Sequence, residues 1–269
     1  MSELTGRVAL VTGANQGIGA ATAIALAASG CDIAIGYFRV PPSDDETYPA
    51  AFDELRAGDG RDVLAAVEAA GRRAVKIEAD LMRPTGPAEL FAAAEAALGR
   101  VDILVNNASA SQRDTFRAGA TDAVGRRAEL VDAASFDAQF LVNARAGGLL
   151  MAEYAGSLAA RDASWGRIVS LTSGGPMGFP GEASYGAAKA ALENYTMTAS
   201  IELADFGVTA NVVYPPVTDT GWVTDEVRAF VAQSTDHVHV ASPDDVAEVI
   251  AWLCSDAARM VTGNVIHLR

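Results

Sequence analysis

The sequence predicts an α/β protein in which helices cover both faces of a doubly wound parallel sheet of about seven strands. Two observations lead to this prediction. Short apolar segments rich in Val and Ile alternate along the chain with longer, Ala- and Leu-rich segments of helical character. The short segments are apolar throughout and do not alternate with polar residues, as expected of strands that are buried on both sides.

The strands and helices are predicted in alternating order. The expected strands cover 7–13, 31–38, 73–80, 101–108, 166–173, 208–215 and 265–269. The expected helices cover 17–30, 62–71, 87–99, 134–162, 183–206 and 242–256. The first of these helices ends at Gly30 and the fifth is followed by Gly207, and glycine often ends a helix because it adopts positive φ readily. Ser242 or Asp244 is suited to cap the last helix.

We expect one domain over residues 1–269, because no linker or internal repeat divides the chain. Two insertions interrupt the alternation, at about 39–62 and 110–130. Both are polar and contain Pro or Gly, so they are predicted to be loops. A lid is expected at about 218–241.

Composition excludes several classes of protein. The 269 residues carry a formal net charge of −14, which disfavours nucleic acid and anionic membrane as partners. The N-terminus has no signal-peptide pattern and no apolar run is long enough to span a membrane, so a cytoplasmic location is expected. Cys31 and Cys254 are interpreted as small hydrophobic residues. His237 and His239 lack further ligands nearby, so no metal site is predicted.

A glycine-rich turn, "TGANQGIG", links the first strand to the first helix. Gly13, Gly17 and Gly19 let the backbone approach a ligand closely. The helix N-terminus behind them favours a pyrophosphate through its free N–H groups and its dipole. The turn therefore predicts nucleotide binding, and a tight turn without a ligand is the alternative.

Tyr185 and Lys189 in "SYGAAKA" are four residues apart on a predicted helix and so share one face. A lysine charge beside a phenol lowers the pKa of the phenol, which then can exchange a proton near neutral pH. The alternative is a surface lysine beside a half-buried tyrosine.

Several ordered motifs resemble those of the short-chain dehydrogenase/reductase (SDR) family over nearly the whole chain. The glycine spacing is GxxxGxG, and it is followed by "AD" at 79–80, "NNA" at 106–108, "LVNAR" around Asn143, "GRIVSLTS", "YGAAK" and "YPPVTDT" at 214–220. The resemblance implies a Rossmann-type fold and an NAD(P)H-dependent oxidoreductase that reduces a ketone reversibly to an alcohol, with tyrosine as general acid.

The resemblance also implies the catalytic residues. Tyr185 is the general acid, Lys189 lowers its pKa and binds the nicotinamide ribose, Ser173 orients the carbonyl, and Asn143 holds a water of the proton relay. The family serine usually lies thirteen residues before the tyrosine, which is Thr172 here. Aligning the strand "GRIVSLTS" from its glycine favours Ser173, with one residue deleted afterwards.

Further residues are implied to bind the cofactor. The loop under the pyrophosphate comprises Gly13, Asn15, Gln16, Gly17, Ile18 and Gly19. Asp80 and Leu81 border the adenine, and Asn107 and Ala108 lie beside the adenosine ribose. Pro215, Val217 and Thr220 meet the nicotinamide end. At the end of the second strand, Phe38 occupies the position of the acid that would bind NAD, and Arg39 follows it. Arg39 suits a 2′-phosphate, so NADP is favoured and NAD remains the alternative.

The substrate is expected to be a hydrophobic ketone or alcohol, because the candidate pocket residues are apolar or aromatic. These are Met177, Phe179, Tyr214, Trp222 and Val223. Two alternatives stay open: a 3-oxoacyl thioester reductase that uses Arg113, Arg117, Arg126 and Arg127 to bind an acidic carrier protein, and a cofactor-sensing regulator without activity.

Three features depart from the family pattern. Ser109 and Pro216 stand where the family usually has glycine, and the usual Asp-Gly-Gly tail is missing after "VIHLR". The family pairs its two long helices between subunits, and the many small residues of 134–162 and 183–206 favour such close packing. A homotetramer or homodimer is therefore expected.

Overall fold

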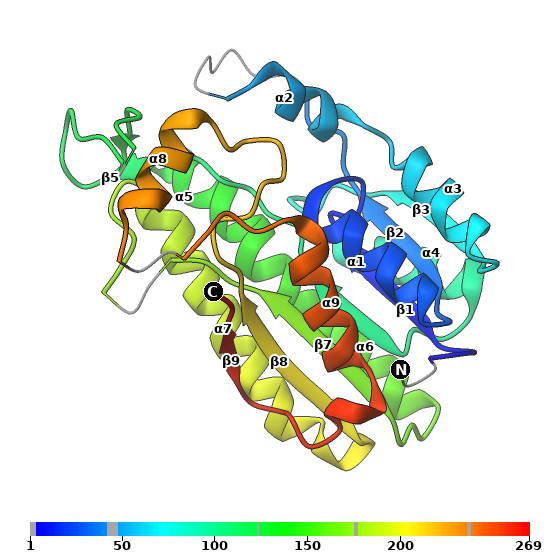
Figure 1. The fold of residues 1–269 in the computed structure, drawn as a ribbon. Coiled ribbons are helices and arrows are strands. Elements are labelled where there is room, and N and C mark those ends of the chain that lie inside the picture. The colour runs from blue at the N-terminus through cyan, green and yellow to red at the C-terminus, as the bar shows by residue number, and fades with distance from the viewer. Residues whose placement is uncertain (1–3, 42–47, 123, 175–176, 236–237) are drawn as a thin grey trace.

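Seven parallel strands form the central sheet of the computed structural model, in the order β3-β2-β1-β4-β7-β8-β9 (Figure 1). The structure describes residues 4–41, 48–122, 124–174, 177–235 and 238–269. The strands are β1 (Val8–Thr12), β2 (Asp32–Tyr37), β3 (Ala74–Glu78), β4 (Ile103–Asn106), β7 (Gly166–Leu171), β8 (Val208–Tyr214) and β9 (Val265–His267). The prediction of a doubly wound α/β fold with about seven strands is confirmed.

The strand order reverses next to β1, which pairs with β2 on one side and with β4 on the other. The chain first builds the sheet outward to β3 and then returns to β4 and continues outward to β9. In sheets of this kind, ligands bind at the carboxyl ends of the strands on either side of the reversal. The glycine-rich turn follows β1 at this edge.

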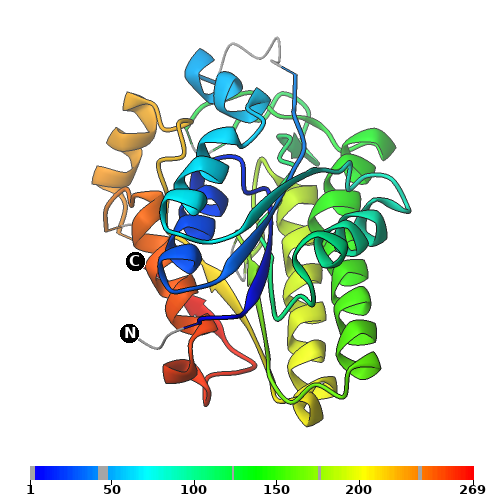
Figure 2. The same ribbon diagram turned by 90° about the vertical axis from the view of Figure 1, so that its right-hand side faces the viewer.

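Helices cover both faces of the sheet (Figure 2). One face carries α1 (Gly17–Ala28), α3 (Arg61–Ala69) and α9 (Pro243–Cys254), and the other carries α4 (Gly86–Leu98), α6 (Gly147–Ala160) and α7 (Ala183–Glu202). Two short 3₁₀ turns, Ala204–Phe206 and Asp256–Ala258, follow α7 and α9. Each face buries its own apolar core, one around Leu26 and Ile250 and the other around Leu150.

Both cysteines lie in the first of these cores and form no disulfide. Burial raises the pKa of the Cys31 thiol to about 12, so this thiol stays protonated. Their interpretation as small hydrophobic residues agrees with this environment.

The segment predicted as one long helix over 134–162 is interrupted in its middle by a π-helical turn. The chain forms α5 (Ala133–Phe140), then a π-helical segment over Leu141–Ala146, and then α6. Gly147 lies where the helix packs against α7, since a Cβ there would lie 2.5 Å from Cδ1 of Leu192. Single π-helical turns are frequent at functional sites, and this one contains Asn143.

The two insertions contain regular structure that the prediction of plain loops missed, and the lid contains a short helix. The first insertion contains α2 (Ala50–Ala57), and the second contains a short pair of strands, β5 (Asp114–Thr115) and β6 (Glu129–Leu130). The lid contains α8 (Asp225–Gln233), and a bridge between Thr218 and Ala241 joins the two ends of the lid. Residues 42–47, 123 and 236–237, including His237, lie outside the described ranges.

Two structural features are absent from the described ranges. None of the helices there combines the length and the apolar character that crossing a bilayer would need. Over the same ranges, no group of three or more His, Cys, Asp or Glu side chains is placed to hold a metal ion.

Candidate active site

The glycine-rich turn at the end of β1 contains glycines at positions where a larger residue would be strained or would clash. Gly13 and Gly17 have φ of 63° and 55°. Gly19 lies so close to the turn that a Cβ there would be 2.3 Å from the Gly13 carbonyl oxygen. A Cβ on Gly17 would be 2.9 Å from Cγ2 of Thr220, so the start of the lid packs directly on the turn.

Asn107 braces this turn from β4. Its side-chain nitrogen Nδ2 donates hydrogen bonds to the carbonyl oxygens of Thr12, at 2.8 Å, and Gly13, at 3.0 Å. The Thr12 hydroxyl accepts from the backbone N–H groups of Asn107 and Ala108, both at 3.0 Å. The side chain of Asn107 therefore shapes the turn. The family resemblance places Asn107 beside the cofactor's adenosine ribose, and this remains an expectation.

The residues at the start of α1 fit a bound dinucleotide. Gln16 is the N-cap residue of α1 and its side chain does not cap the helix, while its buried Oε1 has no hydrogen-bond partner. Exposed N–H groups at a helix start and an orphaned polar atom are what an anionic ligand would satisfy. Ile18 packs against the core. Asn15 instead donates to the Gly58 carbonyl at 3.1 Å, which ties the turn to the first insertion.

The end expected to hold the adenosine carries a charged pair that the sequence did not reveal. The Arg39 guanidinium forms two hydrogen bonds with the Glu78 carboxylate, at 2.9 and 2.8 Å. Phe38 is 45% exposed beside it. Asp80 accepts a hydrogen bond from the Met82 backbone N–H at 2.8 Å, so its carboxylate stabilises the next turn. Leu81 is buried.

Tyr185 lies near the start of α7 with two serine hydroxyls at its phenol. Ser109 donates to the phenolic oxygen at 3.4 Å, and Ser173 also hydrogen-bonds this group. Burial raises the pKa of Tyr185 to about 12, and both serine contacts act to lower it. The expected lowering of the Tyr185 pKa by Lys189 is not found: burial raises this pKa by more than the serine contacts lower it.

Lys189 is almost completely buried on the same face of α7, with 2% of its surface exposed. Its Nζ donates to the Leu171 carbonyl at 3.1 Å and lies 5.7 Å from the centre of the Tyr185 ring. Burial lowers the pKa of Lys189 to about 8. The Lys189 amine therefore lies at the end of β7, close to the segment that carries Ser173.

Thr172 and Ser173 have different partners in the structure. The Thr172 hydroxyl donates to the Glu193 carboxylate on α7, away from Tyr185. Ser173 follows on the opposite side of the chain and contacts the phenol. This arrangement agrees with the strand alignment that favoured Ser173.

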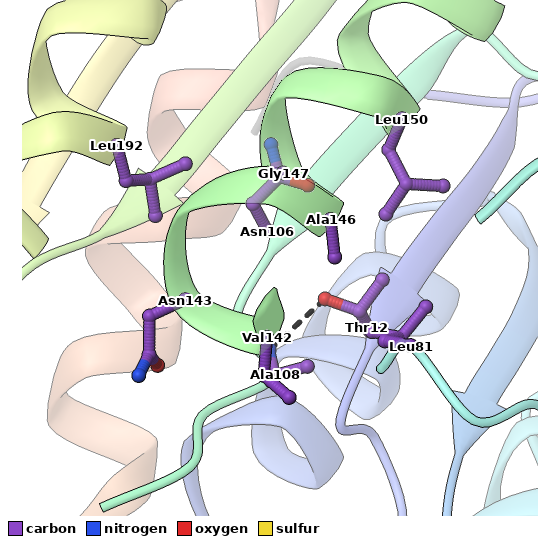
Figure 3. Close-up of a pocket in the computed structure, with 10 residues that line it drawn as sticks. All are labelled: Thr12, Leu81, Asn106, Ala108, Val142, Asn143, Ala146, Gly147, Leu150 and Leu192. Carbon is purple, nitrogen blue, oxygen red and sulfur yellow. Dashed lines mark hydrogen bonds between the residues drawn. The ribbon is translucent and has the colours of Figure 1, made fainter. Parts of the chain in front are cut away.

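The side chain of Asn143 makes two hydrogen bonds with the backbone of Ala110. Its Nδ2 donates to the Ala110 carbonyl at 2.7 Å, and its Oδ1 accepts from the Ala110 N–H at 3.2 Å. Figure 3 shows Asn143 at the edge of a small cavity, with Thr12 and Asn106 among its lining residues. The amide therefore positions the segment that carries Ser109.

The predicted substrate residues divide into two groups. Phe179 lies over Tyr185, with ring centres 6.1 Å apart, and Trp222 donates to the Thr218 carbonyl at 3.0 Å at the base of the lid. Met177 is 95% exposed, so its predicted place in the pocket is not supported. The Tyr214 ring stacks on the His267 ring, with centres 4.8 Å apart. Its hydroxyl donates to the Gly174 carbonyl, so this side chain holds the segment that follows β7.

Sequence reasoning gave no role to several residues at the site. Thr12 has a bracing role that its place before the glycine turn signals only weakly. Ser109 was visible as a departure from the family pattern, but without a function. Tyr48 and Glu182 come from an insertion and a helix start, where no motif marks them.

Comparisons with known proteins agree with this geometry. A family model described as Enoyl-(Acyl carrier protein) reductase matches residues 50–268. The 3-oxoacyl-[acyl-carrier-protein] reductase of Synechocystis sp. is 32% identical over 270 residues, which cover 100% of this chain and 97% of that protein. The Uncharacterized oxidoreductase YjdA of Bacillus subtilis is 39% identical over 171 residues, or 63% of each chain.

Solved structures are similar over almost the whole length. The angucycline C-6 ketoreductase LanV with bound NADP is 30% identical, with a TM-score of 0.79 and coverage of 99% of this chain and 95% of that one. A blue fluorescent protein from a metagenomic library, in complex with NADPH, is 29% identical, with a TM-score of 0.80 and coverage of 99% and 97%. This chain therefore belongs to the short-chain dehydrogenase/reductase family of oxidoreductases.

Proposed function

We propose that this protein is an NADPH-dependent ketone reductase that also runs in reverse as an alcohol dehydrogenase. One observation carries the proposal. The Tyr185 phenol is hydrogen-bonded by the hydroxyls of Ser109 and Ser173, and the buried amine of Lys189 lies on the same helix face. A proton donor with further hydroxyl donors around it suits a carbonyl oxygen that gains negative charge as it is reduced.

The proposed cofactor is NADP(H), which supplies the hydride to the carbonyl carbon. The turn of Gly13, Gly17 and Gly19 with the start of α1 would hold its pyrophosphate. Arg39 at the end of β2 would meet its 2′-phosphate, and Lys189 its nicotinamide ribose. The presence of NADP and NADPH in two similar structures supports this choice.

The chain's own residues handle the proton. The Tyr185 O–H donates its proton to the carbonyl oxygen as that oxygen becomes an alkoxide, and the product is the neutral alcohol. Ser173 donates a hydrogen bond that orients the carbonyl. Lys189, when protonated, stabilises the phenolate that Tyr185 leaves behind. Asn143 keeps the Ala110 segment in place, which fixes Ser109 beside the phenol.

A second candidate function is reduction of a 3-oxoacyl thioester, which the Synechocystis relative favours by its name. The arginines of the second insertion support carrier binding poorly. Arg126 has only 16% of its side chain exposed and pairs with Asp122, and Arg127 pairs with Glu129. Enoyl reduction is less suited to this site, because such enzymes usually space tyrosine and lysine further apart than Tyr185 and Lys189.

The test is NADPH oxidation measured with an aryl ketone, an aliphatic ketone, a keto-ester and a 3-oxoacyl thioester. We expect turnover with a ketone, and Tyr185→Phe should reduce it by about 10²-fold or more while cofactor binding is kept. Absence of turnover with every substrate, together with tight NADPH binding, would instead support a cofactor-sensing regulator.

The same assay tests the choice of serine. Ser173→Ala should reduce turnover far more than Thr172→Ala, because Thr172 faces Glu193. The opposite ranking would contradict the assignment of Ser173.

A further inference from the structure

The first insertion returns to the catalytic edge of the sheet just before α2. There the Tyr48 ring lies 5.3 Å from the ring of Phe52. The guanidinium groups of Arg113 and Arg126, both from the second insertion, lie 5.1 and 5.7 Å from the centre of the Tyr48 ring. Two segments that are far apart in the sequence thus meet at Tyr48 through cation–π contacts.

The lid joins the same group. The Arg126 guanidinium lies 5.7 Å from the Trp222 ring as well. A Cβ on Gly221 would lie 2.9 Å from Cδ1 of Leu55, so α2 packs closely on the start of the lid. Figure 1 shows α2 and α8 together on the side of the sheet where the strands end.

This group is anchored to the start of the catalytic helix. Arg126 hydrogen-bonds Asp122 at 2.6 Å and lies 3.9 Å from the carboxylate of Glu182, which also accepts from Ser111 at 3.3 Å. Glu182 is the N-cap residue of α7 and precedes Tyr185 by less than one helical turn. Burial is the main cause that raises the pKa of Tyr185, and Tyr48 adds a small contribution in the same direction.

We propose that Tyr48 forms a wall of the substrate pocket and, with Phe179 and Trp222, selects flat aromatic ketones. The inference rests on the proposed ketone reductase activity and adds the class of substrate. The three rings come from three separate segments: Phe179 lies 6.1 Å from the Tyr185 ring, and Tyr48 and Trp222 share the Arg126 guanidinium, which reaches the start of α7. Aromatic walls gain most from a substrate that offers a ring to stack on.

The contacts of Tyr48 distinguish this role from a role in cofactor binding. The insertion begins at Arg39, which pairs with Glu78 at the end expected to hold the adenosine. Tyr48 instead contacts arginines of the second insertion, one of which reaches the start of α7. The insertion therefore extends from the adenosine end to the reacting end of the site.

The test compares kinetic constants for an aryl ketone and for a small aliphatic ketone. Tyr48→Ala should raise the KM for the aryl ketone about tenfold, the scale of one lost ring–ring contact, and change the KM for the aliphatic ketone and for NADPH less than twofold. Tyr48→Phe keeps the ring and should recover most of the aryl-ketone affinity. Phe116→Ala is a matched control, since this ring of the second insertion is 86% exposed.

Turnover by the wild-type protein tests the proposed function, and the Tyr48 variants test the role of Tyr48. If the wild-type protein reduces no ketone, the proposed function fails. If it reduces ketones and Tyr48→Ala weakens NADPH alone, or weakens both ketones equally, the role of Tyr48 in selecting aromatic substrates is wrong. A Tyr48→Phe variant as poor as Tyr48→Ala would also overturn the stacking role.

Discussion

Ser109 stands where the family usually has glycine, and its hydroxyl reaches the Tyr185 phenol. A donor at this position stabilises the phenolate, so the contact lowers the pKa of Tyr185. Ser109→Ala should therefore raise this pKa. In alcohol oxidation the phenolate must accept the proton, and the rising limb of the pH–rate profile should move to higher pH.

The expected loss is about two- to tenfold in oxidation rate at a fixed pH below this limb, since a hydrogen bond contributes about 0.5–1.5 kcal/mol. The full pH profile of kcat/KM in the oxidation direction measures it. Ser109→Thr keeps the hydroxyl and should restore the profile. A uniform loss at all pH values, with the limb unmoved, would show that Ser109 only fills space.

Substitutions of Arg39 and of Glu78 should change the KM for NADPH in opposite directions. Arg39→Ala should raise the KM for NADPH about tenfold, because a charge-assisted phosphate contact is lost. Glu78→Gln frees Arg39 from its partner and should lower the same KM severalfold. Neither change should alter the KM for NADH much, because NADH has no 2′-phosphate.

Steady-state kinetics with both cofactors checks this pair of variants. A wild-type preference for NADH, or equal effects on both cofactors, would contradict the role given to Arg39.

For single residues, the sequence predicts those that belong to motifs of fixed spacing, but it misses the side chains from other elements that contact them. Tyr185 and Lys189 lie within one helix, so their common face follows from helical geometry alone. Glu78 lies on a different strand from Arg39, and only the pairing of β2 with β3 brings the two together. The pKa of Tyr185 was predicted in the wrong direction because burial depends on the whole fold.

Among the elements, the turn from β1 to α1 has the least room for change. A Cβ at Gly19 would be 2.3 Å from the Gly13 carbonyl oxygen and 2.4 Å from Nδ2 of Asn107. Gly19→Ala should therefore weaken NADPH binding at least tenfold and destabilise the protein by about 1–3 kcal/mol. Titration of NADPH fluorescence and thermal unfolding measure the two effects.

Gly156 provides the matched control. It is an exposed residue within α6, and a Cβ there would meet no atom within 4 Å. Gly156→Ala should stabilise the protein by about 0.5–1 kcal/mol and leave NADPH binding unchanged. Equal losses in both variants would mean that the close contacts at Gly19 are not the cause.

The elements differ in how well the sequence predicts them. The buried strands were placed within a few residues, because a short apolar segment between turns has few other uses. The short helix α2 was taken for loop, since its 8 residues have little apolar character overall and it packs on the start of the lid. Helices this short are only marginally stable without such packing. The π-helical turn at Asn143 has no sequence signature that distinguishes it from α-helix.

On the scale of the whole molecule, the sheet order follows from rules that need little beyond the strand sequence, since parallel strands joined by helices have few allowed arrangements. The meeting of both insertions and the lid around Arg126 was not predictable. It depends on side-chain contacts between loops, which neither periodicity nor motif spacing records.

The outer surface of the long helices carries exposed apolar side chains that point to subunit pairing. Phe136, Leu149, Tyr195 and Ile201 are 44%, 38%, 49% and 77% exposed. Tyr195 packs beside Gly148, whose Cβ would lie 3.4 Å from the ring, so α6 and α7 together present one surface. A two-fold pairing of this surface would bury these side chains.

We therefore expect a homodimer or, by a second pairing, a homotetramer, with a light-scattering mass about two or four times the 27.8 kDa of the chain. Ile201→Arg together with Tyr195→Glu should lower this mass, because a buried unpaired charge opposes association. Phe116→Glu, which also places a charge at an exposed ring, should leave the mass unchanged if only the α6–α7 surface is paired. A wild-type mass near 27.8 kDa at micromolar concentration would show that these side chains remain exposed to water in solution.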